Sequence, residues 1–236
     1  MFSDWLNFFW PQIGAPWNLQ PGVYNLPWLF ILLQPLRLGG PYGALVIVQI
    51  ASLVVIAKLA QVLRVSKIRF VMVMLSPPVF WALFMGQLDG LFLAAYLLPP
   101  AGAIALTVVK PQVNAGAGWR AIRKQPWTVI IILVLAISVW AIWDWPFSVK
   151  PPPSGNPAER SPWNWSLWPV GVILAPALFF NDRRGGMLVS PFLFPYAGVQ
   201  SLIGPMLVAA TLPWWVFLPV WLGTWARWAY MLKLYP

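Results

Sequence analysis

The chain contains neither cysteine nor histidine. Without cysteine, it cannot form disulfides, thiolate metal sites or cysteine nucleophiles. Without histidine, it cannot bind haem or a pigment through an imidazole, form most zinc sites or use imidazole acid–base catalysis. Any chemistry must therefore use carboxylates, amines, guanidinium groups, hydroxyls, amides or aromatic rings, and we expect no metal or cofactor site.

Acidic residues are also scarce, with five Asp or Glu against 15 Lys or Arg, and charged residues make up only 8% of the 236 positions. A soluble protein is about one-quarter charged. Hydrophobic residues account for 60% of this chain, so we expect most of its surface to contact membrane lipid. The basic excess then reflects membrane topology, and nucleic acid is not an expected partner.

Runs without a charged residue mark the expected membrane segments, because a spanning helix needs about 20 mostly apolar residues. The last of seven such runs is long enough for two spans. The runs are 5–36, 38–57, 70–88, 90–109, 125–143, 161–181 and 185–226. The sequence therefore predicts an all-α integral membrane protein, a single polytopic domain over residues 1–236 with six to eight transmembrane or re-entrant helices.

Proline is abundant, with 26 residues, and it interrupts several of these runs. Proline lacks a backbone N–H and ends or kinks a helix, and irregular backbone at membrane depth needs cover from protein or from a watery cavity. Residues 43–63 and 127–147 are expected to be continuous spans. The main expected breaks are Ser76-Pro77-Pro78, Pro99-Pro100, Lys110-Pro111 and Ser190-Pro191 to Pro195.

The distribution of basic residues predicts the orientation in a cell membrane, because cytoplasmic loops carry an excess of Lys and Arg. The clusters predicted to be cytoplasmic are Arg64, Lys67 and Arg69; Arg120, Arg123 and Lys124; Arg183 and Arg184; and Arg227 and Lys233. The chain between the first two clusters must then cross the membrane twice. Residues 148–162 are predicted to form an outer loop, and residues 1–22 an interfacial segment at the outer face.

Lys110 is the first candidate for chemistry, because an ionisable group at membrane depth is costly. It follows the apolar run 101–109 and precedes Pro111, Gln112 and Asn114. A lysine in a polar notch at a helix break can hold a phosphate as a point charge. The alternative is a lysine that extends from a helix end to the membrane surface.

Three aspartates are candidates for acid–base or sugar-binding roles. Asp89 lies between two apolar runs and could act as a base or orient a sugar hydroxyl; the alternative, which is favoured slightly, is a solvated helix N-terminus. Asp144, between two tryptophans, fits a sugar site or an interfacial anchor. Asp4 is the single acid of the N-terminal segment, and it is either a base or an ordinary surface carboxylate.

Four motifs together resemble a known pattern. They are Tyr24-Asn25-Leu26-Pro27-Trp28 followed by Gln34-Pro35-Leu36, then Gly86-Gln87-Leu88-Asp89, Lys110-Pro111-Gln112, and Ser190-Pro191 to Pro195-Tyr196. Their order and spacing resemble those of the polytopic GT-C glycosyltransferases related to the polyprenyl-phosphate-mannose-dependent mannosyltransferases. The chain is shorter than typical members of that family and lacks the span that precedes their first outer loop.

The resemblance implies a transferase that moves a sugar from a polyprenyl-phosphate carrier to a hydroxyl acceptor at the outer face. The family uses an aspartate in the first outer loop as base and basic residues near the lipid phosphate. Asp4 lies nearest to the former and Lys110 matches the latter, with Asp89 as a second catalytic candidate. The remaining predicted substrate contacts are Gln87, Gln112, Asn114, Asp144 and Tyr196.

Other functions remain open at this level. The chain could be a minimal enzyme, one part of a split enzyme, or a non-catalytic structural subunit of a larger membrane complex. Its short length, its 18 tryptophans and its few polar residues favour a subunit. A transporter or channel is less favoured, because a transport path needs more intramembrane charge than Lys110 and Asp89 supply.

Overall fold

Short helices separated by proline and glycine make up the fold. The computed structural model describes residues 4–15, 27–143, 164, 165, 168, 170–180, 182–195 and 197–234. Within these ranges the regular structure is helical and contains no β-strand, apart from one isolated bridge between Asn164 and Gly198. The prediction of an all-α protein is confirmed. The predicted outer loop 148–162 lies outside the described residues.

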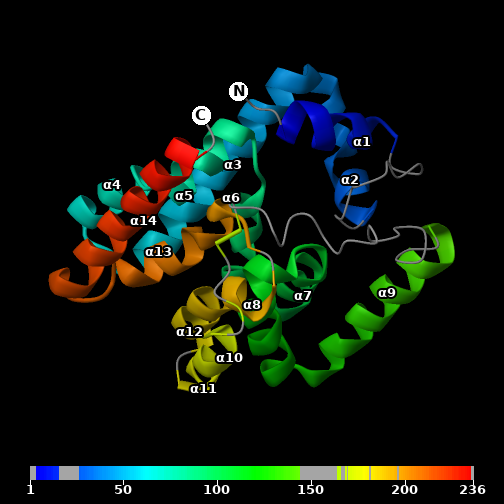
Figure 1. Cartoon of the computed structure of the whole chain (residues 1–236). Helices are drawn as coiled ribbons and strands as arrows, with labels where there is room; N and C mark the ends of the chain where they lie inside the picture. The colour runs from blue at the N-terminus through cyan, green and yellow to red at the C-terminus, as the bar shows by residue number, and fades with distance from the viewer. Residues whose placement is uncertain are drawn as a thin grey trace.

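The helices are labelled in chain order (Figure 1), with η for the short 3₁₀ and π segments. Their bounds are η1 Trp5–Phe9, α1 Trp10–Gly14, α2 Pro27–Leu33, η2 Gln34–Gly39, α3 Gly40–Val62, α4 Lys67–Met74, α5 Pro77–Met85, α6 Asp89–Phe92, η3 Leu93–Tyr96, α7 Pro100–Val109, α8 Pro111–Lys124, η4 Pro126–Thr128, α9 Val129–Trp143, α10 Val170–Leu174, α11 Ala177–Phe180, α12 Asp182–Val189, η5 Ser190–Leu193, η6 Val199–Leu202, α13 Ile203–Ala209 and α14 Trp214–Leu234.

The predicted proline breaks are confirmed as helix boundaries. Helices α5, α7 and α8 begin at Pro77, Pro100 and Pro111, and Pro191 is the second residue of η5. Proline suits the first turn of a helix, where its missing N–H costs no hydrogen bond. The break before Pro77 bends the α4–α5 pair by 47°. A chain divided in this way places several backbone breaks inside the protein.

One continuous stretch, Pro27–Val62, is long and apolar enough to cross a membrane, and the bent α4–α5 pair would be a second such segment within the described residues. The expected continuous span 43–63 corresponds to α3, which ends at Val62. The span expected over 127–147 corresponds to the shorter helix α9, and residues 144–147 lie outside the described residues. The larger number of six to eight spans remains a prediction.

Helix α3 is apolar on two opposite faces. Leu45, Val48 and Ile56 recur at helical spacing and are buried in the main core, whereas Val46 and Ile50 on another face are more than half exposed. A helix with apolar residues on all sides needs a second apolar environment besides its own core. The outward face of α3 therefore fits contact with lipid or with another protein.

The N-terminal segment packs into the same core. The indole of Trp5 is 0% exposed and donates a hydrogen bond to the carbonyl oxygen of Pro41 at 2.8 Å, and Phe9 and Ile13 are also buried. Phe8, on the opposite side, is half exposed. In the described part of the predicted interfacial segment 1–22, one face thus packs against the protein interior. The position of this segment at a membrane interface remains a prediction.

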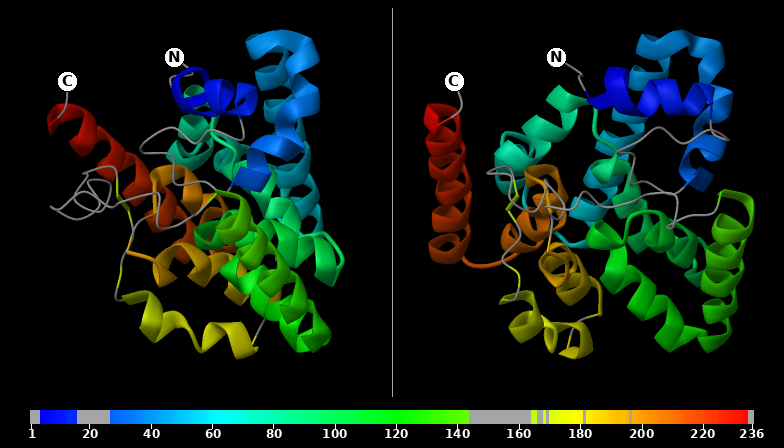
Figure 2. Two further views of the ribbon diagram at one scale, coloured as in Figure 1. Left: turned by 90° about the vertical axis from the view of Figure 1, so that its right-hand side faces the viewer. Right: turned by 45° about the vertical axis from the view of Figure 1, so that its right-hand side comes forward.

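Helices η1 and α1 lie on the same side of the molecule as the C-terminal end of α14, and Figure 2 shows them set apart from it (Figures 1 and 2). Helices α10, α11 and α12 gather at the opposite side, beside α7 and α8. Helix α9 lies at the periphery, and Trp28 of α2 reaches it through a 3.0 Å hydrogen bond to Ser138. The candidate site lies in the core between these groups of helices.

One contact conflicts with the predicted orientation. The guanidinium of Arg227 lies 5.1 Å from the ring centroid of Trp165 and donates a hydrogen bond to the carbonyl oxygen of Asn164. Arg227 was assigned to the cytoplasmic clusters and Trp165 to the outer interface, so the two assignments cannot both hold. Arg69 of the first basic cluster packs on Trp214, at the start of α14. Arg227 lies about 20 Å further along the same helix, so the two arginines lie far apart along α14.

Candidate functional site

The Gly86-Gln87-Leu88-Asp89 motif is the turn between α5 and α6. Gly86 has φ = 73°, a left-handed conformation that ends α5, and the backbone N–H of Gln87 donates back to the carbonyl oxygen of Ala82. A Cβ on Gly86 would lie 2.6 Å from the Cβ of Trp5, so a larger residue would collide there. The turn thereby directs Asp89 into the core and holds Gln87 beside the N-terminal segment.

Asp89 and Lys110 form a buried ion pair, although 20 residues separate them in the chain. Lys110 Nζ lies 2.5 Å from Asp89 Oδ2, and the hydroxyl of Ser201 donates to Asp89 Oδ1 at 2.7 Å. Asp89 is 0% exposed and Lys110 is 6% exposed. Both carboxylate oxygens are thus engaged, and three segments of the chain meet at one polar centre.

This geometry excludes one alternative for each residue. Asp89 is the first residue of α6, but it is fully buried and its carboxylate binds Lys110 and Ser201, so it is not a solvated helix N-terminus. Lys110 occupies the break between α7 and α8, as predicted, and its buried ammonium does not extend to the surface. The carboxylate of Asp89 neutralises the ammonium charge of Lys110, whereas the sequence suggested that Lys110 could hold a phosphate.

Asp4 contacts the same turn through Gln87, which precedes Asp89 by two residues. The amide Nε2 of Gln87 donates a short hydrogen bond to Asp4 Oδ2. Gln87 is buried, and Asp4 is half-buried at the N-cap of η1. The structure therefore pairs Asp4 with Gln87 and Asp89 with Lys110, and all four residues were singled out from the sequence.

The two other candidates on α8 differ from each other. Asn114 is fully buried; its amide donates weakly to the carbonyl oxygen of Leu106, its backbone oxygen accepts from Thr107, and its side-chain oxygen has no hydrogen-bond partner. It therefore ties α7 to α8. Gln112 is half-buried in the first turn of α8. The last two predicted contacts, Asp144 and Tyr196, lie outside the described residues.

A second polar group joins the Ser190-Pro191 motif to α8. Ser190 Oγ accepts a hydrogen bond from the backbone N–H of Gly116 at 2.9 Å, donates to the carbonyl oxygen of Gly186 at 2.7 Å, and lies 3.0 Å from the hydroxyl of Tyr96. Gly116 and Gly186 touch directly, since a Cβ on Gly116 would lie 2.1 Å from Gly186 Cα. This contact presses α8 against α12.

Sequence reasoning missed Ser201, Tyr96 and Gly116. Ser201 follows the last motif by a few residues and lies in a mixed apolar stretch, where nothing distinguishes its hydroxyl from a structural serine. Tyr96 carried no signal either, because its neighbours are apolar. Only the close packing of glycine-rich α8 could have been suspected, from the run Gly116-Ala117-Gly118.

The cost of disrupting the Asp89–Lys110 pair follows from its burial. Removing one partner of a buried ion pair leaves an uncompensated charge and costs about 3–5 kcal/mol. Removing either Asp89 or Lys110 would therefore destabilise the packing of α6 against the α7–α8 break. Asp4 is less buried than Asp89 and keeps partial exposure.

No family model, no curated protein and no solved structure matches this chain. The likeness to GT-C glycosyltransferases therefore rests on the four motifs alone.

Proposed function

We propose that the chain is a multi-pass, membrane-embedded, glycosyltransferase-like protein that moves a sugar from a polyprenyl-phosphate donor to a hydroxyl acceptor at the outer face. One observation carries the proposal. In a chain that has only five acidic residues, the motif Gly86 to Asp89 contacts both of the other candidates, because Gln87 is hydrogen-bonded to Asp4 and Asp89 is paired with Lys110 of the Lys110 to Gln112 motif.

The reaction needs a carboxylate and a positive charge, and Asp4 and Lys110 are the candidates. A carboxylate must take the proton of the acceptor hydroxyl as its oxygen attacks the anomeric carbon, and we assign this role to Asp4. The bond from the sugar to the phosphate oxygen breaks, and polyprenyl phosphate leaves with the electron pair. Positive charge near that oxygen stabilises the leaving group, and we assign this role to Lys110.

Lys110 can take this role only by exchanging partners. Its ammonium is bound to one oxygen of Asp89, while Ser201 holds the other oxygen. A donor phosphate would replace Asp89 on the ammonium, and Ser201 would keep the freed carboxylate hydrogen-bonded. Asp89 is then a positioning residue that holds Lys110 until the donor arrives, and Gln87 keeps Asp4 oriented.

The test uses a variant that spares the buried pair. Asp4→Asn keeps an oxygen that can accept from Gln87, and Asp4 is only half-buried, so the variant should fold with a stability within about 1 kcal/mol of wild type. Purified protein in liposomes is given polyprenyl-phosphate-mannose with tritium-labelled sugar and octyl mannoside as acceptor. We expect Asp4→Asn to transfer at least about 100-fold more slowly, because general-base catalysis is lost.

The matched control is Asp4→Glu, which retains a carboxylate and should keep a measurable part of the activity. Transfer by Asp4→Asn at the wild-type rate would remove Asp4 from the mechanism. A wild-type protein that transfers neither mannose nor glucose from polyprenyl phosphate would reject the transferase proposal itself.

A second candidate function is that of a non-catalytic subunit of a larger membrane complex. The observation that favours it is the closed Asp89–Lys110–Ser201 contact, in which each charged group already has its partner and serves packing. The outward apolar face of α3 offers a surface for another membrane protein. Gentle purification from the native membrane distinguishes the two, because a subunit should copurify with a stoichiometric partner and lack transferase activity.

A further inference from the structure

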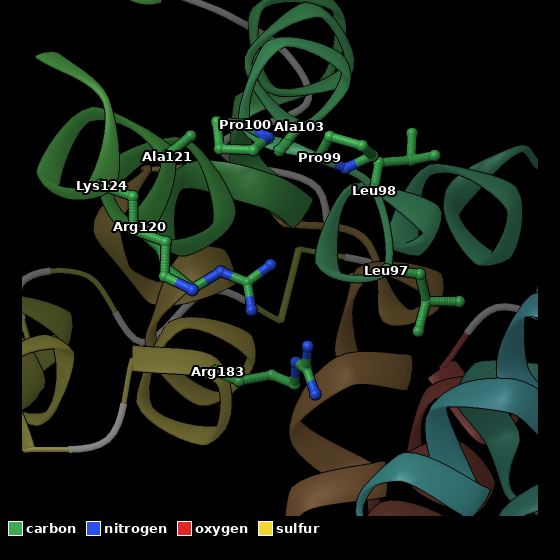
Figure 3. A pocket seen from close by; sticks show the side chains of 9 residues that line it. All are labelled: Leu97, Leu98, Pro99, Pro100, Ala103, Arg120, Ala121, Lys124 and Arg183. Atoms are coloured by element: carbon green, nitrogen blue, oxygen red, sulfur yellow. The ribbon is translucent and has the colours of Figure 1, made fainter.

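A second set of cations lies away from the Asp89–Lys110 centre and lines a cavity of about 310 Å³. Its basic wall comes from Arg120 and Lys124 at the end of α8 and from Arg183 of α12. Figure 3 shows the guanidinium groups of Arg120 and Arg183 directed toward the same space. None of the nine lining residues in the described part of the chain is acidic.

The cations are held there by the fold. Arg120 donates a hydrogen bond to the carbonyl oxygen of Tyr96 at 3.2 Å, which fixes its side chain across the cavity wall. The Nε of Arg183 is buried and has no hydrogen-bond partner. The Gly116–Gly186 contact holds α8 and α12 together and so keeps the two arginines near each other. Like charges held together at a cavity, with a donor unused, indicate a place for an anion.

The opposite wall is apolar and contains a helix N-terminus. Leu97, Leu98 and Ala103 line it, together with Pro99 and Pro100, where the 10-residue helix α7 begins. The N-terminal end of a helix carries partial positive charge and favours anions. The basic side chains and the start of α7 therefore suit a phosphate, and the apolar side chains suit a hydrocarbon chain. This combination is found in basic pockets between helices that bind lipid headgroups.

We propose that this cavity binds a phosphate group carried by an amphiphile, with Arg120 and Arg183 as bidentate partners of the phosphate oxygens and Lys124 as a third cation. The same chemistry would also accept free phosphate, so the two sources have to be separated by experiment. The site is distinct from the proposed transfer centre, and its binding can be measured without any transferase activity.

The experiment titrates the purified full chain in uncharged detergent micelles with dihexanoyl phosphatidic acid, inorganic phosphate and dihexanoyl phosphatidylcholine. The readouts are tryptophan fluorescence, to which the neighbouring Trp119 contributes, and isothermal calorimetry. We expect phosphatidic acid to bind, and phosphatidylcholine to bind at least about tenfold more weakly because its headgroup has no net negative charge. Inorganic phosphate binding as well as phosphatidic acid would assign the site to free phosphate.

Two variants and two matched controls decide whether the cavity is responsible. Arg183→Gln and Arg120→Gln should each weaken phosphatidic acid binding by about tenfold or more, because a charged donor to the phosphate is lost. Arg123→Gln and Arg184→Gln remove the same charge from the same two helices but do not line the cavity, and they should leave binding within about threefold of wild type. No binding of any anion, or an equal loss in all four variants, would overturn the proposal.

Discussion

The two groups of cations in this chain differ in what surrounds them. Lys110 is buried against Asp89 and Ser201, and its charge is neutralised inside the protein. Arg120 and Arg183 line a cavity without an acidic neighbour among the lining residues that the structure describes. The comparison teaches that position in the fold separates the two groups: Lys110 holds segments of the core together, whereas Arg120 and Arg183 lie at the wall of a cavity.

The largest effect is expected from breaking the pair. Lys110→Ala leaves the Asp89 carboxylate buried without its counter-ion, so we expect a loss of about 3–5 kcal/mol in the free energy of unfolding. Unfolding of the purified protein in mixed detergent micelles measures this. Lys58→Ala, which removes an exposed lysine from α3, serves as the control and should change stability by no more than about 0.5 kcal/mol. Equal small losses in both variants would show that Lys110 is not a buried partner.

Ser201→Ala tests the hydrogen bond that Ser201 donates to the Asp89 carboxylate. The hydroxyl donates to the second oxygen of Asp89, and this buried bond to a charged acceptor has no replacement in alanine. We expect a loss of about 1.5–3 kcal/mol, measured in the same unfolding assay. Ser138→Ala, whose hydroxyl lies on the peripheral helix α9, should cost less. A cost at Ser201 no greater than that at Ser138 would contradict the assigned geometry.

Gly116→Ala is a way to disturb the cation-lined cavity from a distance. The added methyl group would meet the backbone of Gly186 and push α8 from α12, so we expect a loss of about 1–3 kcal/mol in stability together with weaker phosphatidic acid binding. Gly223→Ala, in the open part of α14, has nothing within 4 Å of the new methyl group and should be neutral or slightly stabilising. Wild-type behaviour of Gly116→Ala would mean that the two helices are not in backbone contact.

The smallest stability effect is expected at the cavity itself. Arg183 is partly exposed and faces another arginine, so Arg183→Gln should change the free energy of unfolding by no more than about 0.5 kcal/mol while it weakens phosphate binding. The unfolding assay used for Lys110→Ala measures it. A loss as large as that of Lys110→Ala would remove the contrast between the two groups of cations.

The helix boundaries could be predicted from the sequence because proline acts locally. A missing N–H and a fixed φ have the same effect in any surroundings, and the breaks at Pro77, Pro100 and Pro111 follow from that. The charge scarcity likewise made Lys110, Asp89 and Asp4 candidates, since a buried charge needs a reason. These predictions depend on single residues and their immediate neighbours.

The partners of those residues could not be predicted, because they depend on how distant segments fold back. Nothing in the sequence pairs Asp89 with Lys110, Ser201 with Asp89, or Gln87 with Asp4. The sides assigned to Arg227 and Trp165 conflict for the same reason. Charge clusters were counted along the chain, whereas the fold places Arg227 against Trp165.

Double-mutant cycles on the two groups of cations test the contrast most directly. One cycle combines Asp89→Asn with Lys110→Met, the other Arg120→Gln with Arg183→Gln, and each is measured by unfolding in mixed micelles. Opposite charges in the core should give a favourable coupling of about 3 kcal/mol, and the two arginines a weakly unfavourable coupling of about 0.5 kcal/mol. Couplings of the same sign in both cycles, or none between Asp89 and Lys110, would contradict the account.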